Sequence, residues 1–311
     1  MYDNVDFWLQ SGDAGGVDFL SALPRCIEIS GQHDFNGTPV LTGRIEGLRV
    51  SITPDSLRIK DGSLCKWHLG DNFQTMQRAD TKQAIERLSD ILSLPMDRAT
   101  VTRIDVAQNF IVKHPTLVYF NHLGEYAKGK RLEQPDGLYY SGNNGLLVFY
   151  NKTKEQQDKG QPIPELYQGR NTLRYEQRYK KRLGKTFGVD RVTGACLYDE
   201  AFYKGIVDRW REAYKSIKKV NDIQLKFEGM KTKRDLYMYG VLSLVTMSGG
   251  ERAMLSQITE AQRMGELTSK QAYDLRMAIA EACKVKDGLT VQSDVISELD
   301  KKVDEAVRFY R

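Results

Sequence analysis

Alternating side chains mark the stretch that decides the fold, VTRIDVAQNF at residues 101–110. In a β-strand, residues two positions apart share a face. One face of this stretch carries Arg103, Asp105, Ala107 and Asn109, and the other carries Ile104, Val106 and Phe110. We therefore expect a strand with one apolar face toward the core and one charged face away from it.

Two later stretches alternate in the same way. One face of residues 147–154 carries Val148, Tyr150, Lys152 and Lys154, and one face of residues 171–178 carries Thr172, Arg174, Glu176 and Arg178. If the three strands are neighbours, their polar faces form one surface that holds Arg103, Asp105, Tyr150, Lys152, Arg174 and Glu176. Alternation predicts the faces, but it does not predict which strands are adjacent.

Such a surface would bring together two carboxylates, those of Asp105 and Glu176. Adjacent carboxylates repel each other, and one then holds its proton more tightly unless a cation lies between them. Mg²⁺ and Mn²⁺ prefer oxygen ligands and often bind one or two carboxylates together with phosphate oxygens. A tyrosine beside such an ion can lose its proton and attack phosphorus. The alternative is an ordinary half-exposed sheet, balanced by Asp–Arg and Glu–Lys pairs across strands.

The remaining patterns predict an α+β fold with a largely antiparallel central sheet. Strand pairs are expected at residues 40–60 and 137–151. Helices are expected at 81–94, 115–126 and 197–220. The helices at 81–94 and 197–220 would cover the apolar face of the sheet. From residue 226 the periodicity is helical, at 235–247, 251–264, 269–284 and 291–311. We expect a first domain over 1–225 and a mainly helical C-terminal domain over 226–311.

Composition indicates a globular protein with a local excess of positive charge. The net charge is +5, but residues 170–219 alone hold 14 Lys and Arg against six Asp and Glu. This excess, among many tyrosines, suits nucleic acid. The four cysteines have no Cys-x-x-Cys spacing, and no apolar run approaches the ~20 residues of a membrane span. The N-terminus has no signal-peptide pattern, so we expect a cytoplasmic protein without a disulfide framework.

Three short motifs resemble those of rolling-circle replication initiators. They are TRID at 102–105, LVFYNK at 147–152 and LRYEQR at 173–178, in this order and at similar spacing. The resemblance is to the gene II protein family of filamentous phages and related phage and plasmid replication proteins. The tyrosine motif is also similar to that of staphylococcal-type plasmid initiators. The resemblance covers about residues 95–190; the first 90 residues match only in general strand pattern, and the C-terminal tail does not match.

The resemblance implies roles for individual residues. Tyr150 would be the nicking nucleophile that forms a 5′-phosphotyrosyl intermediate, and Asp105 and Glu176 would hold Mg²⁺ or Mn²⁺. From charge and from the alternation of side chains along the strand, we add that Lys152 would steady the scissile phosphate or lower the pKa of Tyr150. Contacts to DNA are expected from Arg103, Lys154, Arg174, Arg178, Lys180, Lys181, Arg182 and Lys185.

Several competing interpretations are weaker on sequence grounds. The four histidines lack the His-hydrophobic-His spacing of many nickases, so the chain fits an acid-ligand site. LGKT at 183–186 resembles the end of a P-loop, but residue 179 is Tyr where the loop needs Gly. Tyr179 is a rival nucleophile, although its parity places it off the charged face. Tyr139 and Tyr140 could serve a second strand transfer.

The predicted function is metal-dependent, site-specific nicking and strand transfer at a replication origin. Expected partners are origin DNA, single-stranded at the nick site, a host helicase and polymerase, and a second copy of the chain, but no membrane. A conjugative relaxase would use the same chemistry. A non-catalytic DNA-binding regulator would keep the sheet without the cutting.

Overall fold

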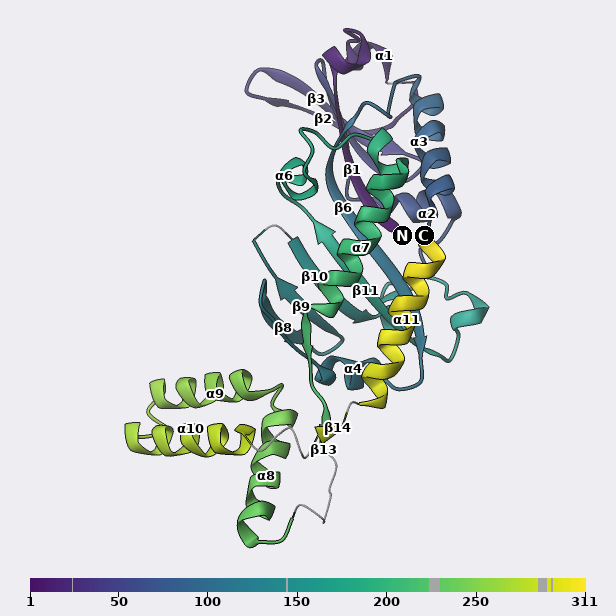
Figure 1. Ribbon diagram of the computed structural model, residues 1–311. Coiled ribbons are helices and arrows are strands. Elements are labelled where there is room, and N and C mark those ends of the chain that lie inside the picture. Colours follow the sequence, from purple (N-terminus) through teal and green to yellow (C-terminus); the bar gives the residue numbers. More distant parts are fainter. Residues whose placement is uncertain (24, 144, 224–229, 285–289, 292) are drawn as a thin grey trace.

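A single antiparallel sheet of ten strands dominates the computed structural model (Figure 1), which describes residues 1–23, 25–143, 145–223, 230–284, 290–291 and 293–311. The strand order is β2-β3-β4-β5-β1-β6-β11-β10-β9-β8. These strands are β1 (Tyr2–Gln10), β2 (Glu28–Phe35), β3 (Thr38–Ile45), β4 (Leu48–Thr53), β5 (Ser56–Lys60), β6 (Thr100–Val112), β8 (Lys130–Gln134), β9 (Gly137–Ser141), β10 (Gly145–Asn151) and β11 (Asn171–Tyr179). The predicted α+β class with an antiparallel sheet is confirmed.

The three motif-bearing strands lie side by side. β11 is hydrogen-bonded to β6 on one side and to β10 on the other, and β6 also pairs with β1. The adjacency that alternation alone could not predict is therefore present at the centre of the sheet.

One face of the sheet carries the main core, under the helices α3 (Arg78–Leu92), α7 (Glu200–Lys215) and α11 (Asp294–Tyr310). Phe149, Tyr175 and Trp210 stack across three elements, with ring centroids 4.5 Å apart for the first pair and 4.8 Å for the second. The Tyr175 hydroxyl donates to the Trp210 carbonyl at 3.0 Å. The predicted cover of the apolar face by helices near 81–94 and 197–220 is confirmed.

Several predicted boundaries shift. β10 ends at Asn151, whose side chain accepts from the Lys154 amide at 3.0 Å and caps α5 (Lys152–Asp158). The prediction that Lys152 and Lys154 continue the strand is therefore wrong. The helix expected at 115–126 is only α4 (Thr116–His122), followed by β7 (Leu123–Tyr126), and residues 40–60 hold parts of three strands.

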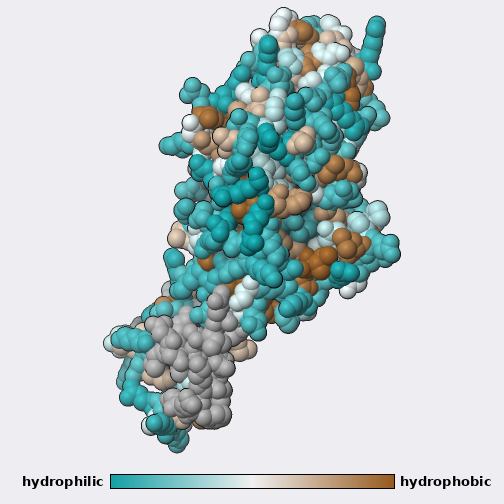
Figure 2. Space-filling view, turned by 45° about the vertical axis from the view of Figure 1, so that its right-hand side comes forward, coloured by the Kyte–Doolittle hydropathy of each residue, from teal (hydrophilic) through white to brown (hydrophobic). Residues whose placement is uncertain are grey.

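The shorter elements connect these parts. Beside the sheet lie α1 (Phe19–Ala22), α2 (Leu64–Leu69), α6 (Leu183–Phe187) and the 3-10 turns Ser11–Ala14, Glu165–Tyr167 and Ala195–Tyr198. Two small ladders pair β12 (Ile217–Lys219) with β7, and β13 (Asp222–Ile223) with β14 (Thr290–Val291). Hydrophilic side chains cover most of the face shown in Figure 2. None of the helices in the described ranges is long and apolar enough to cross a membrane.

The C-terminal region divides between two cores. The predicted helices α8 (Lys233–Met247), α9 (Glu251–Arg263) and α10 (Ser269–Lys284) are present and share a small core around Val245, Ile258 and Ile279. α11 instead returns to the main core, where Arg211 on α7 pairs with Asp304 at 2.7 Å. The predicted boundary at residues 225–226 lies outside the described residues.

We expect the aromatic stack beneath α7 to be the main source of stability. Trp210→Ala removes a fully buried ring and should lower the free energy of unfolding by about 3–5 kcal/mol in urea denaturation. The control Phe309→Ala removes an exposed ring and should change it by less than about 0.5 kcal/mol. Equal losses in the two variants would contradict this view of the core.

Candidate active site on the polar face of the sheet

Strand register brings the predicted site residues onto one face. Directly opposite residues share a face. Asp105 lies opposite Arg178, Glu176 lies opposite Val148, and Tyr150 lies opposite Arg174. Side chains from β6, β11 and β10 therefore meet on the face of the sheet opposite the main core.

Arginines hold the two carboxylates, which are 0% (Asp105) and 1% (Glu176) exposed. Arg103 Nε donates to Asp105 Oδ1 at 2.9 Å. Arg178 donates from Nε and Nη2 to the two carboxylate oxygens of Glu176, at 3.0 and 3.2 Å, and its Nε lies 4.0 Å from Asp105 Oδ2. One guanidinium thus bridges both acids.

The positive charge does not fully compensate Glu176. Burial raises the pKa of its carboxyl, and this effect outweighs the opposing charges of Arg174 and Arg178. The negative charges of Asp3 and Asp105 raise the pKa further.

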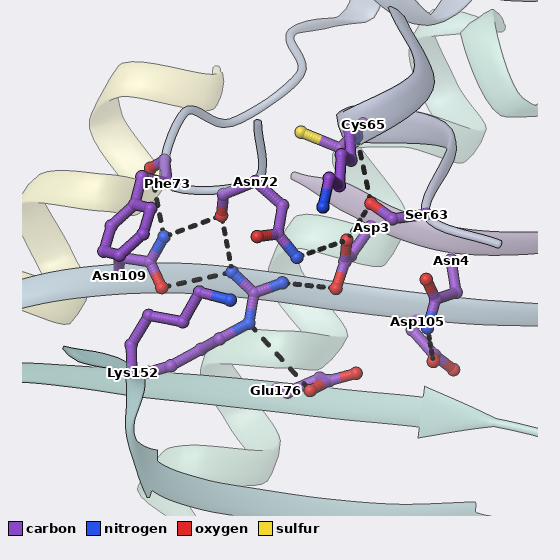
Figure 3. A network of polar contacts seen from close by, with 12 residues as sticks. Asp3, Asn4, Ser63, Cys65, Asn72, Phe73, Asp105, Asn109, Lys152 and Glu176 are labelled. Carbon is purple, nitrogen blue, oxygen red and sulfur yellow. Dashed lines mark hydrogen bonds and ion pairs between the residues drawn. The ribbon is translucent and has the colours of Figure 1, made fainter. Parts of the chain in front are cut away.

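Arg174 is a buried clamp, not a surface cation. Only 1% exposed, it donates from Nη1 to the Asn72 carbonyl at 3.0 Å and to Asn109 Oδ1 at 3.1 Å, and from Nη2 to Asp3. Figure 3 shows Asp3, Asn72, Asn109 and Glu176 arranged around this guanidinium. The prediction that Arg174 contacts a phosphate is corrected, because its guanidinium is buried and both Nη atoms donate to protein acceptors; its Nε makes no hydrogen bond within the described residues and lies 4.0 Å from Glu176 Oε2.

Tyr150 opens onto a cavity of about 400 Å³, which it lines together with Tyr139, Glu155 and Arg178. Among the residues that the structure describes, its hydroxyl has no hydrogen-bond partner. Burial raises the pKa of this hydroxyl well above its usual value, and the nearby charge of Arg174 only partly opposes the shift. The phenol is therefore protonated at neutral pH until a cation or a base assists it.

Lys152 lies beneath the site at the start of α5. It is 1% exposed, and its ammonium pairs with Glu155 at 2.8 Å. Burial and the charge of Arg174 lower the pKa of Lys152. Burial alone would raise the pKa of Glu155. Hydrogen bonds from Lys152 and Lys159 outweigh this effect and lower the pKa to about 2. The Lys152 ammonium is thus paired within α5 and also lies 5.4 Å from the centre of the Phe73 ring.

The predicted DNA-contacting cations differ in availability. Lys154 pairs with Asp158 at 3.2 Å and with Asp136 at 3.7 Å, and Arg103 is 17% exposed at its side chain. Four cations just after β11 are exposed and make no ion pair within the described ranges: Lys180, Lys181, Arg182 and Lys185. These four are free to meet phosphates.

Two of the rival tyrosines, Tyr179 and Tyr140, lie on the opposite face of the sheet from Tyr150. Tyr179 is buried on the helix-covered face, where it packs against Phe187 with centroids 5.0 Å apart. The Tyr140 hydroxyl donates to the carbonyls of Leu123 and Gly124. Only Tyr139, opposite Val148, shares the cavity of Tyr150.

A family model that describes the N-terminal part of a phage replication-associated protein, the gene II protein, matches residues 1–196. The chain belongs to this family. The predicted resemblance to filamentous phage gene II-type initiators is confirmed, and the match also takes in the first 94 residues. No curated protein matches the chain. Membership of the gene II protein family supports a role in rolling-circle replication, with DNA binding.

Sequence reasoning missed part of the site that β1 contributes. Asp3 accepts from Ser63 Oγ at 2.5 Å, and Asn4 Nδ2 donates to Asp105 Oδ2 at 3.1 Å. The signal was two acids, Asp3 and Asp6, within an otherwise apolar stretch. The register of β1 with β6 shifts between Tyr2 and Val5, so simple alternation does not describe this strand.

We expect removal of Arg174 to destabilise the site more than removal of Arg178. Arg174→Met leaves the buried Asp3 carboxylate without its cationic partner and should lower the free energy of unfolding by about 3–5 kcal/mol. Arg178→Met should cost less, about 1–3 kcal/mol, because Arg178 is 26% exposed at its side chain and Arg103 still pairs with Asp105. Urea denaturation of both variants, with Arg174→Met also made in an Asp3→Asn background, measures the coupling. Full additivity of the Arg174 and Asp3 changes would contradict the clamp.

Glu155 should stabilise the fold in a pH-dependent way. Because folding lowers its pKa from 4.5 to about 2, its contribution is present above pH 4.5 and is lost as the pH falls toward 2. Glu155→Gln should cost roughly 2 kcal/mol at neutral pH and progressively less in acid. The control Glu165→Gln, at an exposed position, should show no such trend in unfolding experiments across pH. A cost independent of pH would refute the assignment.

Proposed function

We propose that the chain is a metal-dependent DNA nickase and strand transferase that starts rolling-circle replication, with Tyr150 as its nucleophile. The observation that carries the proposal is the position of Tyr150. Its hydroxyl, without a partner among the described residues, shares a cavity with Arg178, the residue that bridges Asp105 and Glu176. Family membership favours replication initiation over the relaxase alternative.

The reaction would be an in-line exchange of phosphate esters. Tyr150 Oη would form a bond to phosphorus as the bond from phosphorus to the 3′ oxygen breaks. The tyrosine loses its proton, the 3′ oxygen gains one, and the 5′ end stays linked to the tyrosine. The linkage remains a phosphodiester, so a later 3′-hydroxyl can reverse the step and close a circle.

Arg178 is the residue best placed to bind the scissile phosphate. Its guanidinium borders the Tyr150 cavity and is partly exposed, so it can turn from the carboxylates toward an incoming phosphate. The exposed cations at 180–185 would then hold the neighbouring phosphates. Lys152, which is paired and buried, would act by positioning β10 and α5.

The carboxylate pair fits a hard divalent ion in part. No group of three or more metal-ligating side chains occurs within the described residues. Asp105 and Glu176 nevertheless contact one common cation, Arg178, and Mg²⁺ characteristically uses one or two carboxylates with phosphate oxygens and water. Mg²⁺ or Mn²⁺ bound there would stabilise negative charge on the phosphate and favour loss of the tyrosine proton.

Other partners remain predictions. Origin DNA, single-stranded at the nick site, follows from the proposed chemistry. A host helicase, a polymerase, a homodimer and a cytoplasmic location are expected from the proposed role.

The direct test is nicking of the supercoiled replicon that encodes the protein, with and without Mg²⁺ or Mn²⁺. Wild type should give relaxed circles with protein covalently attached, in a metal-dependent way. Tyr150→Phe should lose the adduct, by at least about a thousandfold, and should keep its affinity for DNA. Tyr139→Phe is the matched control, because it removes a hydroxyl from the same cavity.

An adduct formed by Tyr150→Phe would show that the nucleophile is wrong. Loss of the adduct in Tyr139→Phe alone would transfer the role to Tyr139. DNA binding by wild type with no nicking at the correct origin would favour the non-catalytic regulator.

A further inference from the structure

A second concave surface lies where β8, β9, β10 and β11 end together. We call it the strand-end groove; its volume is about 630 Å³, and its lining includes Lys128, Lys130, Asn143, Gln177, Arg178 and Tyr179. The register explains the meeting: Lys130 lies opposite Ser141, and Leu146 lies opposite both Ser141 and Arg178. Residues far apart in sequence thus line one groove.

The lining of the groove is positively charged, and Lys128 and Lys130 are the two of its cations that no carboxylate of the described residues compensates, since Arg178 pairs with Glu176. The described lining contains three cations, Lys128, Lys130 and Arg178, and no Asp or Glu. Lys128 and Lys130 are exposed and make no ion pair in the part of the chain that the structure describes. Such cations in a concave surface favour a polyanion.

Two buried polar atoms also lie in the lining. Gln177 Oε1 and Tyr179 Oη are shielded from solvent, and neither makes a hydrogen bond of normal geometry within the described residues. The two side chains face each other: burial raises the pKa of the Tyr179 hydroxyl, and a weak hydrogen bond with Gln177, outside normal geometry, lowers it slightly. Buried polar groups are normally satisfied, so these two in a cavity point to a ligand with hydrogen-bonding groups of its own. A nucleotide carries both phosphate and such groups, on its base and sugar.

Arg178 joins the groove to the proposed active site, because it lines both the groove and the cavity of Tyr150. Leu146 and Tyr150 are four residues apart on β10, or about 13 Å at the usual rise of a strand. A strand of DNA could therefore continue from one site to the other around the end of the sheet.

We propose that the strand-end groove binds single-stranded DNA that flanks the nick site, with Lys128 and Lys130 on phosphates and Gln177 and Tyr179 on a base or sugar. The identity of the ligand rests on the proposed function. A pocket of this size admits unstacked nucleotides, whereas a duplex would keep its bases away from the buried groups.

The test is the salt dependence of affinity for a fluorescent oligothymidylate. Each phosphate contact on a single strand contributes about 0.7 to the slope of log K against log salt. Lys128→Ala/Lys130→Ala should reduce this slope by about 1.4. Lys82→Ala/Lys301→Ala is the matched control; it removes the same charge from α3 and α11, away from the groove, and should leave the slope unchanged.

A second variant tests the polar contacts. Tyr179→Phe removes only the buried hydroxyl and should weaken binding about fivefold without changing the slope. Equal slopes for wild type and the Lys128/Lys130 variant, or a change seen with duplex DNA only, would overturn the proposal. Covalent adduct formation by wild type, measured in parallel, reports on the proposed function separately from the groove.

Discussion

Two carboxylates buried on the polar face of a sheet impose the main constraint on this protein. Asp105 and Glu176 are almost wholly removed from solvent, and a buried charge is tolerated only when it is paired. The structure meets this demand with arginines from the same strands. Because Arg178 serves both acids, any ligand that replaces it must also carry positive charge.

The same constraint orders the surrounding chain. Arg174 lies opposite Asn109 and Tyr150, and once buried it needs acceptors of its own. β1 supplies Asp3, and the segment after α2 supplies the Asn72 carbonyl. On the opposite face the stack of Phe149, Tyr175 and Trp210 fixes the same strands from beneath. The polar face of these strands therefore rests on a closely packed aromatic layer, as the proposed nucleophile Tyr150 would require.

Alternation in the sequence predicted the faces of β6 and β11 correctly, because these two strands pair with each other without a register shift. It failed at Lys152, where the Asn151 cap turns the chain into a helix. It also missed β1, whose register shifts. The amphipathic pattern of α11 predicted a helix but not its place, because periodicity shows which side is buried and not what covers it.

The pattern of charge in the sequence predicted some of the exposed cations and missed others. The basic run at 180–185 is visible in the sequence and is exposed in the structure. Lys128 and Lys130 attract no notice in sequence, since only strand pairing brings them beside Arg178. The burial of Arg174 could not be predicted either. Side-chain alternation shows on which face of the sheet a residue lies, but not which other segments cover that face.

Binding of Mn²⁺, followed by water-proton relaxation without DNA, tests most directly whether Asp105 and Glu176 form one cation site. Wild type should bind one ion weakly, and Arg178→Ala should bind it more tightly because the competing guanidinium is gone. Glu176→Gln in that background should abolish the gain. Unchanged Mn²⁺ affinity in Arg178→Ala, or a gain that survives Glu176→Gln, would contradict a shared site for guanidinium and metal.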